Sequence, residues 1–163
     1  MQKLKVYLES TMFNYYFDVD RDAHLDTVEF FEECKAGDFE AYTSDYVIEE
    51  LDAAPEDKRS KMLALIEQYK IAVLPASEEA DSLAQRYIAD GTMPGGSLVD
   101  ARHIAIAPIN SLDIVVSLNF QHIVKSRTVQ FTGAINIIMG LKPQGIYSPM
   151  EVLSSEKTRY HLG

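Results

Sequence analysis

The stretch over residues 97–119, SLVDARHIAIAPINSLDIVVSLN, constrains the fold of this chain more than any other part of the sequence. It opens with a helix-start signal, because Ser97 can cap a helix and Asp100, three residues later, completes a variant of the capping box. Apolar residues then recur at helical spacing until Pro108, where we expect the helix to be interrupted. The β-branched run at 114–116 is typical of a short strand buried in a parallel sheet.

The rest of the chain repeats this alternation of strands and helices. We expect strands over residues 5–8, 39–43, 71–74, 114–116 and 146–147. We expect helices over 12–17, 22–34, 45–51, 55–66, 77–89, 97–107 and 124–141. The alternation predicts one α/β domain with a mostly parallel central sheet over residues 1–150, followed by a polar tail over residues 151–163.

Composition limits the class of protein. The 163 residues suffice for a single domain with its own core, and no apolar run is long enough to cross a membrane. A single cysteine, Cys34, cannot form an internal disulfide, so we expect a cytoplasmic protein. The net charge of −10 is uneven: residues 1–98 carry 21 acids and 9 bases, whereas residues 99–163 carry 4 acids and 6 bases. The C-terminal part can therefore meet phosphates while the acidic remainder is solvated.

Acidic side chains come near the ends of three predicted strands. Glu9 ends the first strand, Glu50 lies in the helix after the second, and Asp100 starts the helix before the fourth. Asn119 follows the fourth strand. Because ligands bind at the carboxyl edge of open parallel sheets, these oxygens predict a Mg²⁺ or Mn²⁺ site. The alternative is that the acids serve as helix caps or surface charges and never meet.

Four segments resemble the PIN-domain family, which includes the VapC-type toxins of toxin–antitoxin pairs. They are KVYLEST, TSDYVIEEL, SLVDARHIAIA and DIVVSLNF, and they follow one another in the family's order and at its spacing. The resemblance implies a Rossmann-like α/β/α sandwich that acts as a metal-dependent endoribonuclease, leaving 3′-hydroxyl and 5′-phosphate ends. It also implies that Glu9, Glu50 and Asp100 are metal-site acids, with a homodimer and a small antitoxin as partners.

Two positions depart from the family pattern. The first acid is usually Asp and here is Glu9, which is one methylene longer. The fourth acid is replaced by Asn119, whose amide offers an oxygen without a charge. Metal binding should weaken, so two hypotheses stand: an RNA endonuclease in which Asn119 supports a ligand or water, or a PIN-fold module that binds RNA or protein through a weakened or inactive site.

Other side chains around these segments are candidate RNA contacts. The hydroxyls of Ser10, Thr11 and Ser117 could bind a phosphate or one of the acids, and Lys125 and Arg127 follow the fourth strand. Alternatively, the hydroxyls serve only as helix caps, and the two basic residues are isolated surface charges without a function.

Two further motifs have competing interpretations. His103 lies nearly one turn after Asp100 and could bind a metal, but its place on the apolar face favours a core histidine. Residues 18–29 place acids at positions 1, 3, 5, 9 and 12 of a calcium-binding loop, yet Ala23 occupies the position where the turn needs glycine. A negatively charged helix start explains the same acids without calcium.

Overall fold

The computed structural model describes residues 3–162, with side chains through residue 155. Within these residues, five strands form one sheet in the order β3-β2-β1-β4-β5, and every neighbouring pair is parallel. The strands are β1 (Leu4–Leu8), β2 (Phe39–Ser44), β3 (Ala72–Leu74), β4 (Ile114–Val116) and β5 (Gly145–Tyr147). The predicted α/β class is confirmed, and the sheet is parallel throughout.

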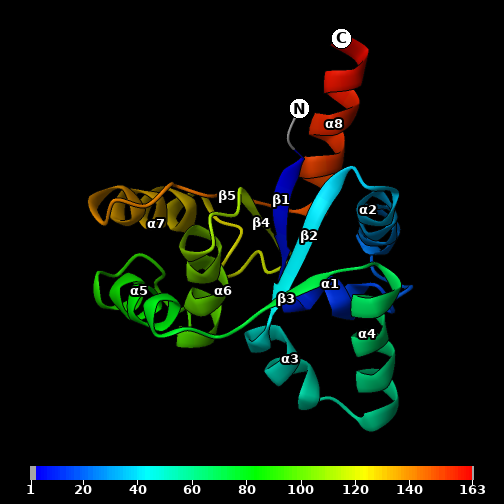
Figure 1. Cartoon of the computed structure of the whole chain (residues 1–163), viewed down its shortest axis with the longest axis horizontal. Helices are drawn as coiled ribbons and strands as arrows, with labels where there is room; N and C mark the ends of the chain where they lie inside the picture. Colours follow the sequence, from blue (N-terminus) through cyan, green and yellow to red (C-terminus); the bar gives the residue numbers. More distant parts are fainter. Residues whose placement is uncertain (1–2, 163) are drawn as a thin grey trace.

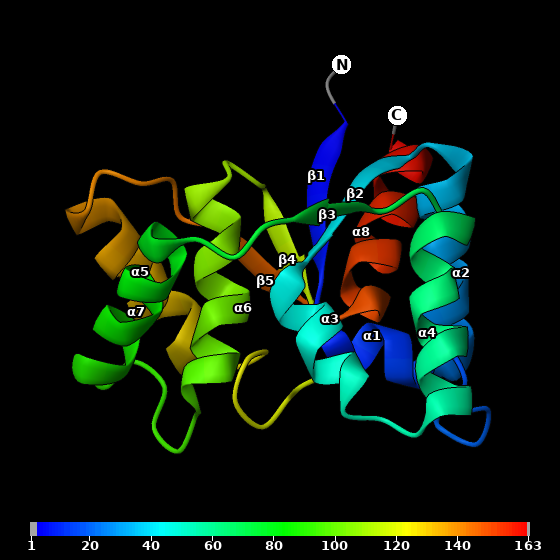
Figure 2. The same ribbon diagram turned by 60° about the horizontal axis from the view of Figure 1, so that its bottom comes forward.

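Helices cover both faces of the sheet, as Figures 1 and 2 show from two directions. The helices are α1 (Ser10–Tyr15), α2 (His24–Ala36), α3 (Asp45–Asp52), α4 (Glu56–Gln68), α5 (Glu78–Ala89), α6 (Leu98–Ile109), α7 (Ser126–Ile138) and α8 (Pro149–Leu162). Helices α5, α6 and α7 lie on one side of the sheet, and α1, α2, α4 and α8 lie on the other. The arrangement is the predicted α/β/α sandwich.

Strand β1 is the centre of the sheet and of the core. Its last three residues, Val6–Leu8, are fully buried, and the strand pairs with β2 on one side and β4 on the other. Because parallel strands end at one edge, the residues at or directly after the ends of β1, β2 and β4 are brought together there. Glu9, Ser44 and Ser117 therefore lie at a common edge although they are far apart in the sequence.

Helix starts were well marked in the sequence. The Ser97 side chain accepts a hydrogen bond from the Asp100 backbone N–H, and the Asp100 carboxylate accepts one from the Ser97 N–H, which is the predicted capping box. Ser44 caps α3 by accepting a hydrogen bond from Tyr46 N at 3.2 Å. Gly37, with a φ of 93°, ends α2 in the left-handed conformation that glycine adopts most easily.

Three sequence predictions were wrong in detail. Pro108 does not interrupt α6, which continues to Ile109; so close to the helix end it removes a single hydrogen bond, and the buried residues around it hold the last turn. The helical spacing of Leu25, Val28 and Phe31 predicts that all three face the core. Leu25 is instead 78% exposed, because Thr27, Phe30 and Phe31 form the inner face of α2.

The segment expected as a polar tail is also different. Residues 151–162 belong to α8, and the side chains of Val152 and Leu153 are buried. Helix α8 packs against α2, so this segment extends the sandwich rather than leaving it. Gly163 lies outside the described residues.

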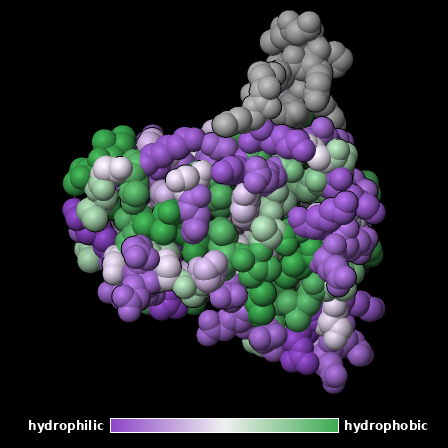
Figure 3. Space-filling view, in the orientation of Figure 1, coloured by the Kyte–Doolittle hydropathy of each residue, from purple (hydrophilic) through white to green (hydrophobic). Residues whose placement is uncertain are grey.

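The surface carries hydrophobic side chains at the end of α7, at the left of Figure 3. Ile137, Ile138 and Met139 are each at least half exposed there. No helix among the described residues is long and apolar enough to span a membrane.

Asp113, just before β4, gives the fold a measurable pH dependence. Burial raises its pKa, but the Lys142 ammonium and the Lys5 backbone N–H, both hydrogen-bonded to the carboxylate, outweigh burial and hold the pKa below its usual value. A lowered pKa means that the stabilisation is present above pH ~4 and disappears as the pH falls through the folded-state pKa. We expect Asp113→Asn to cost about 1 kcal/mol of unfolding free energy at pH 7 and progressively less below pH ~4.

Denaturant unfolding across this pH range measures the effect, with Asp20→Asn, at an exposed loop acid, as the control. A deficit for Asp113→Asn that does not change with pH would contradict the explanation.

Candidate functional site

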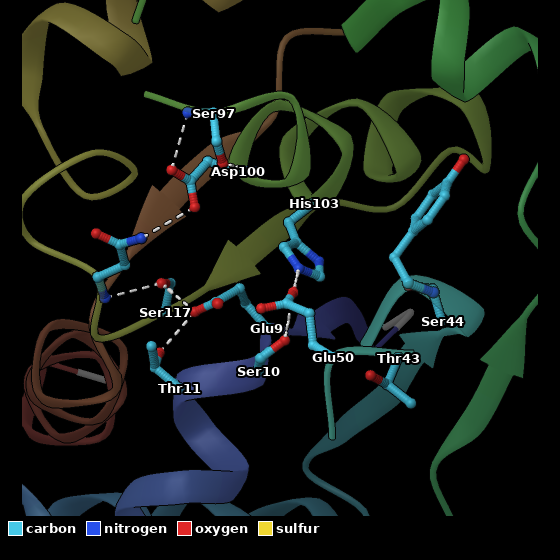
Figure 4. Close-up of polar contacts among 12 residues, drawn as sticks. Glu9, Ser10, Thr11, Thr43, Ser44, Glu50, Ser97, Asp100, His103 and Ser117 are labelled. Atoms are coloured by element: carbon cyan, nitrogen blue, oxygen red, sulfur yellow. Dashed lines mark hydrogen bonds and ion pairs between the residues drawn. The ribbon is translucent and has the colours of Figure 1, made fainter. Parts of the chain in front are cut away.

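Three titratable side chains converge at the carboxyl edge of the sheet (Figure 4). Glu9 follows β1 at the N-cap of α1, Glu50 lies in the last turn of α3, and His103 lies in the middle of α6. One ligand atom from each residue lies within 4.8 Å of the other two. The structure thus brings together two of the three predicted acids and adds a histidine.

Glu9 is the buried acid of the group, with 3% of its surface exposed. Its Oε1 accepts hydrogen bonds from Thr11 Oγ1 and Ser117 Oγ, each at 2.6 Å. The Thr11 hydroxyl oxygen in turn accepts a hydrogen bond from Leu118 N at 2.8 Å. Burial of a carboxylate costs free energy unless its oxygens are hydrogen-bonded or paired with a charge. The two hydroxyls meet this requirement and hold the Glu9 side chain in place, and both of their hydrogen bonds are made to Oε1.

Glu50 is more accessible, with 38% of its side chain exposed. Its Oε1 accepts a hydrogen bond from Ser10 Oγ at 2.9 Å and is in direct contact with His103 Nε2. Burial raises the pKa of Glu50, but the hydrogen bond and charge of His103, with the Ser10 hydroxyl, outweigh burial and lower the pKa below its usual value. Glu50 is therefore a carboxylate at neutral pH.

His103 is buried, as predicted, but its surroundings are polar. Its Nδ1 is hydrogen-bonded to the Tyr7 hydroxyl at 2.8 Å, and that hydroxyl is bonded to Ser44 Oγ at 2.7 Å. Burial lowers the pKa of His103, but the Glu50 hydrogen bond and the charges of Glu9, Glu50 and Asp100 outweigh burial and raise the pKa. The histidine thus belongs to the core and to the site at once.

Asp100 and Asn119 form a second pair at the same edge. Asn119 Nδ2 donates to Asp100 Oδ1 at 3.3 Å, while Asp100 Oδ2 accepts the Ser97 N–H at 3.2 Å as part of the capping box. Asn119 Oδ1 accepts the His122 N–H at 3.0 Å. Among the described residues, Asp100 is not in the group of ligand atoms within 4.8 Å of one another. Asn119 therefore acts here as a donor that orients Asp100.

The candidate RNA contacts divide into two kinds. The hydroxyls of Ser10, Thr11 and Ser117 hold the two glutamates, so they orient acids in this structure. Lys125 is exposed and lines an open cleft of about 400 Å³ with Phe120 and Tyr147 among its other walls.

Arg127 points elsewhere. Its guanidinium lies 4.8 Å from the centre of the Phe131 ring and donates to the Gly91 carbonyl at 3.4 Å.

The calcium-loop alternative finds no support in the geometry. Helix α2 begins at His24, inside the segment 18–29, and Asp18 pairs with Arg21 at 3.6 Å. Across residues 3–155, the acids of this segment form no group of three with ligand atoms close enough to share an ion.

Sequence reasoning missed the role of Tyr7 and Ser44, which support His103 from behind. Tyr7 lies inside the predicted strand over residues 5–8, and Ser44 directly precedes the predicted helix over residues 45–51, so neither residue indicates a functional role in the sequence. A usable signal existed: a histidine on the apolar face of a helix needs a buried polar partner, and a tyrosine in a buried strand can supply one.

The donor set fits a divalent metal ion. Two carboxylates and an imidazole face one another, and within the described part of the chain no lysine or arginine forms an ion pair with Glu9 or Glu50. The His103 imidazole, which pairs with Glu50, offsets part of the repulsion between the two acids, and a bound divalent cation would offset it further.

Comparison with solved structures identifies the architecture. Mycobacterium tuberculosis VapC20, described as a toxin that cleaves the sarcin-ricin loop, matches 68% of this chain and 86% of its own with a TM-score of 0.55. The fold is PIN-like. The two sequences are 12% identical, so this likeness concerns the fold alone. No family model matches the sequence, and no curated protein sequence matches it either.

The Tyr7 hydroxyl should contribute measurably to stability. It is fully buried, and Tyr7→Phe would leave His103 Nδ1 without its partner. We expect a loss of about 1–3 kcal/mol in unfolding free energy, the usual cost of an unsatisfied buried polar group. The control is Tyr42→Phe, whose exposed hydroxyl donates to Glu40 and should matter by no more than about 0.5 kcal/mol. Equal effects in denaturant unfolding would contradict the linking role of Tyr7.

Proposed function

We propose that this chain is a metal-dependent endoribonuclease of the PIN type and the toxin of a toxin–antitoxin pair. The observation that carries the proposal is the meeting of Glu9 and Glu50 with His103 at the carboxyl edge of a parallel sheet. The PIN-like fold, and a structural neighbour described as cleaving the sarcin-ricin loop, support RNA as the substrate.

In this proposal Glu9, Glu50 and Asp100 are the acids of the metal site, and they hold Mg²⁺ or Mn²⁺. Such an ion, when bound, activates a water for attack on the phosphodiester and stabilises the charge that develops on the phosphate. Ser10, Thr11 and Ser117 keep the two glutamates oriented through their hydrogen bonds.

The remaining residues have supporting roles. Asn119 orients Asp100 by donating to its carboxylate, and the lowered pKa of Glu50 keeps that side chain charged at neutral pH. The exposed ammonium of Lys125, beside the open cleft, is placed to bind an RNA phosphate.

Partners follow from the same proposal. An antitoxin protein that covers the edge of the sheet would have to place a positive side chain near Glu9 and Glu50, because that edge is acidic. We also propose a homodimer and a cytoplasmic location, where cellular RNA is available.

The second candidate function is an RNA- or protein-binding module with an inactive site. It is favoured by one observation, the replacement of the fourth family acid by Asn119, whose amide group faces Asp100. A carboxylate in that place would add charge to the site, and the amide does not.

Substitution of Glu50 distinguishes the two functions. Glu50→Gln removes a charged ligand while keeping the shape of the side chain, so we expect RNA cleavage to fall by at least about 100-fold. The matched control is Glu49→Gln, because Glu49 is an exposed neighbour on the same helix and outside the three-residue group. Cleavage of labelled RNA with Mn²⁺ present measures both variants, and equal rates for the two would contradict the proposed mechanism.

Asn119→Asp tests whether the site is complete as it stands. The change replaces a hydrogen-bond donor by a carboxylate facing Asp100, so we expect the metal-free protein to lose about 1–2 kcal/mol of stability. Added Mn²⁺ should raise the melting temperature more in this variant than in the wild type. Unchanged or reduced cleavage is the expected result for a working site, whereas a large gain in cleavage would favour the inactive module.

A further inference from the structure

We infer that His103 is a direct ligand of the metal through Nε2, and that this nitrogen makes the site select Mn²⁺ and other imidazole-binding divalent ions over Mg²⁺. The inference rests on the proposed function, since it concerns the same metal site. In place of ligands that are all oxygen atoms, the metal would be bound by carboxylate oxygens of Glu9 and Glu50 and by the imidazole nitrogen of His103.

The first argument is position. The side chain of His103 is 1% exposed, and its Nε2 faces both glutamates in the one group of ligand atoms within 4.8 Å found among the described residues. Asp100 lies outside that group, and its two oxygens are occupied by Asn119 and by the backbone of Ser97. A metal bound between the glutamates therefore meets the imidazole before it meets the third acid.

The second argument is the support behind the ring. Metal-binding histidines use their other ring nitrogen in a hydrogen bond that fixes the orientation of the ring and the tautomer. His103 does this through Nδ1, which is bonded to the buried Tyr7 hydroxyl and, through it, to Ser44 Oγ. When Nδ1–H donates to Tyr7 and the Tyr7 hydroxyl donates to Ser44, the Nε2 lone pair is directed at the glutamates.

In the metal-free protein a proton on Nε2 fills the contact between His103 and Glu50. A lone pair that faces the carboxylate oxygen of Glu50 is repelled by it unless a proton or a metal ion lies between them. Nε2 also lies 3.5 Å from Ser10 Oγ, so a bound metal ion would take the place of the Nε2 proton among these oxygen atoms. The hydrogen bonds of Nδ1 to Tyr7, and of Tyr7 to Ser44, are those expected behind a metal-binding imidazole.

The choice of metal follows from donor chemistry. Mg²⁺ favours oxygen ligands in octahedral geometry and gives up its waters reluctantly, whereas imidazole suits transition-metal ions. Mn²⁺ accepts carboxylate oxygens and an imidazole in one site. We expect the wild-type protein to bind Mn²⁺ at least about 10-fold more tightly than Mg²⁺, because even loss of a hydrogen-bond partner behind a ligand changes metal affinity by about 10–100-fold.

Pulsed electron paramagnetic resonance on the full chain with one equivalent of Mn²⁺ tests the inference directly. Coordinated imidazole gives a ¹⁴N modulation of the Mn²⁺ echo, and ¹⁵N-histidine labelling should replace it by a ¹⁵N signal. His103→Gln should remove this modulation and reduce Mn²⁺ affinity by about 10-fold or more, while Mg²⁺ affinity changes less. The wild-type spectrum keeps the test valid even where the variant folds poorly.

The control is His122→Gln, because His122 is the histidine that follows the Asn119 loop and its buried Nδ1 has no hydrogen-bond partner. Modulation that survives this change supports His103 as the ligand, whereas modulation that disappears with it would overturn the assignment. Mn²⁺ that binds without any nitrogen modulation would overturn the inference and leave the proposed nuclease standing. Absence of Mn²⁺ and Mg²⁺ binding by the wild-type protein would instead overturn the proposed function, and the inference with it.

Discussion

The buried carboxylate of Glu9 is the point on which this site depends. Thr11 and Ser117 donate to it, and the Thr11 hydroxyl also accepts the backbone N–H of Leu118, so one acid ties the end of β1 to the end of β4. These two strands are neighbours at the centre of the sheet. The hydrogen bonds that offset the free-energy cost of burying the charge also orient the carboxylate toward the edge of the sheet. The site is therefore arranged as the protein folds.

Which features of this structure can be predicted from the sequence depends on how far apart in the sequence the interacting residues lie. Strand and helix positions, the capping box of Ser97 and Asp100 and the meeting of Glu9 with Glu50 follow from local patterns and from the rule that parallel strands end together. The bond between Tyr7 and His103 joins residues 96 positions apart, and no local pattern encodes it. The predicted interruption of the helix at Pro108 was wrong for the opposite reason, because tertiary packing outweighed the local preference of proline.

Each departure from the PIN-family pattern is accommodated by hydrogen bonds of its own. Glu9 is longer than the usual aspartate, and its extra reach is taken up by two hydroxyl donors that hold it against the sheet. Asn119 gives up a charge but gains a hydrogen bond to Asp100 and accepts another from the backbone of His122. The site therefore carries less negative charge than the family pattern implies, and an imidazole stands where oxygen ligands alone were expected.

The Asp100 side chain has two roles. It is part of the capping box that starts α6, and it accepts a hydrogen bond from Asn119. A replacement that removes its side-chain oxygens also loosens the first turn of the helix that carries His103. Under the proposed function, an inactive form is better made at Glu50, which lies late in a short helix and is partly exposed. Glu50→Gln would leave the capping box of α6 intact, and with it the helix that carries His103.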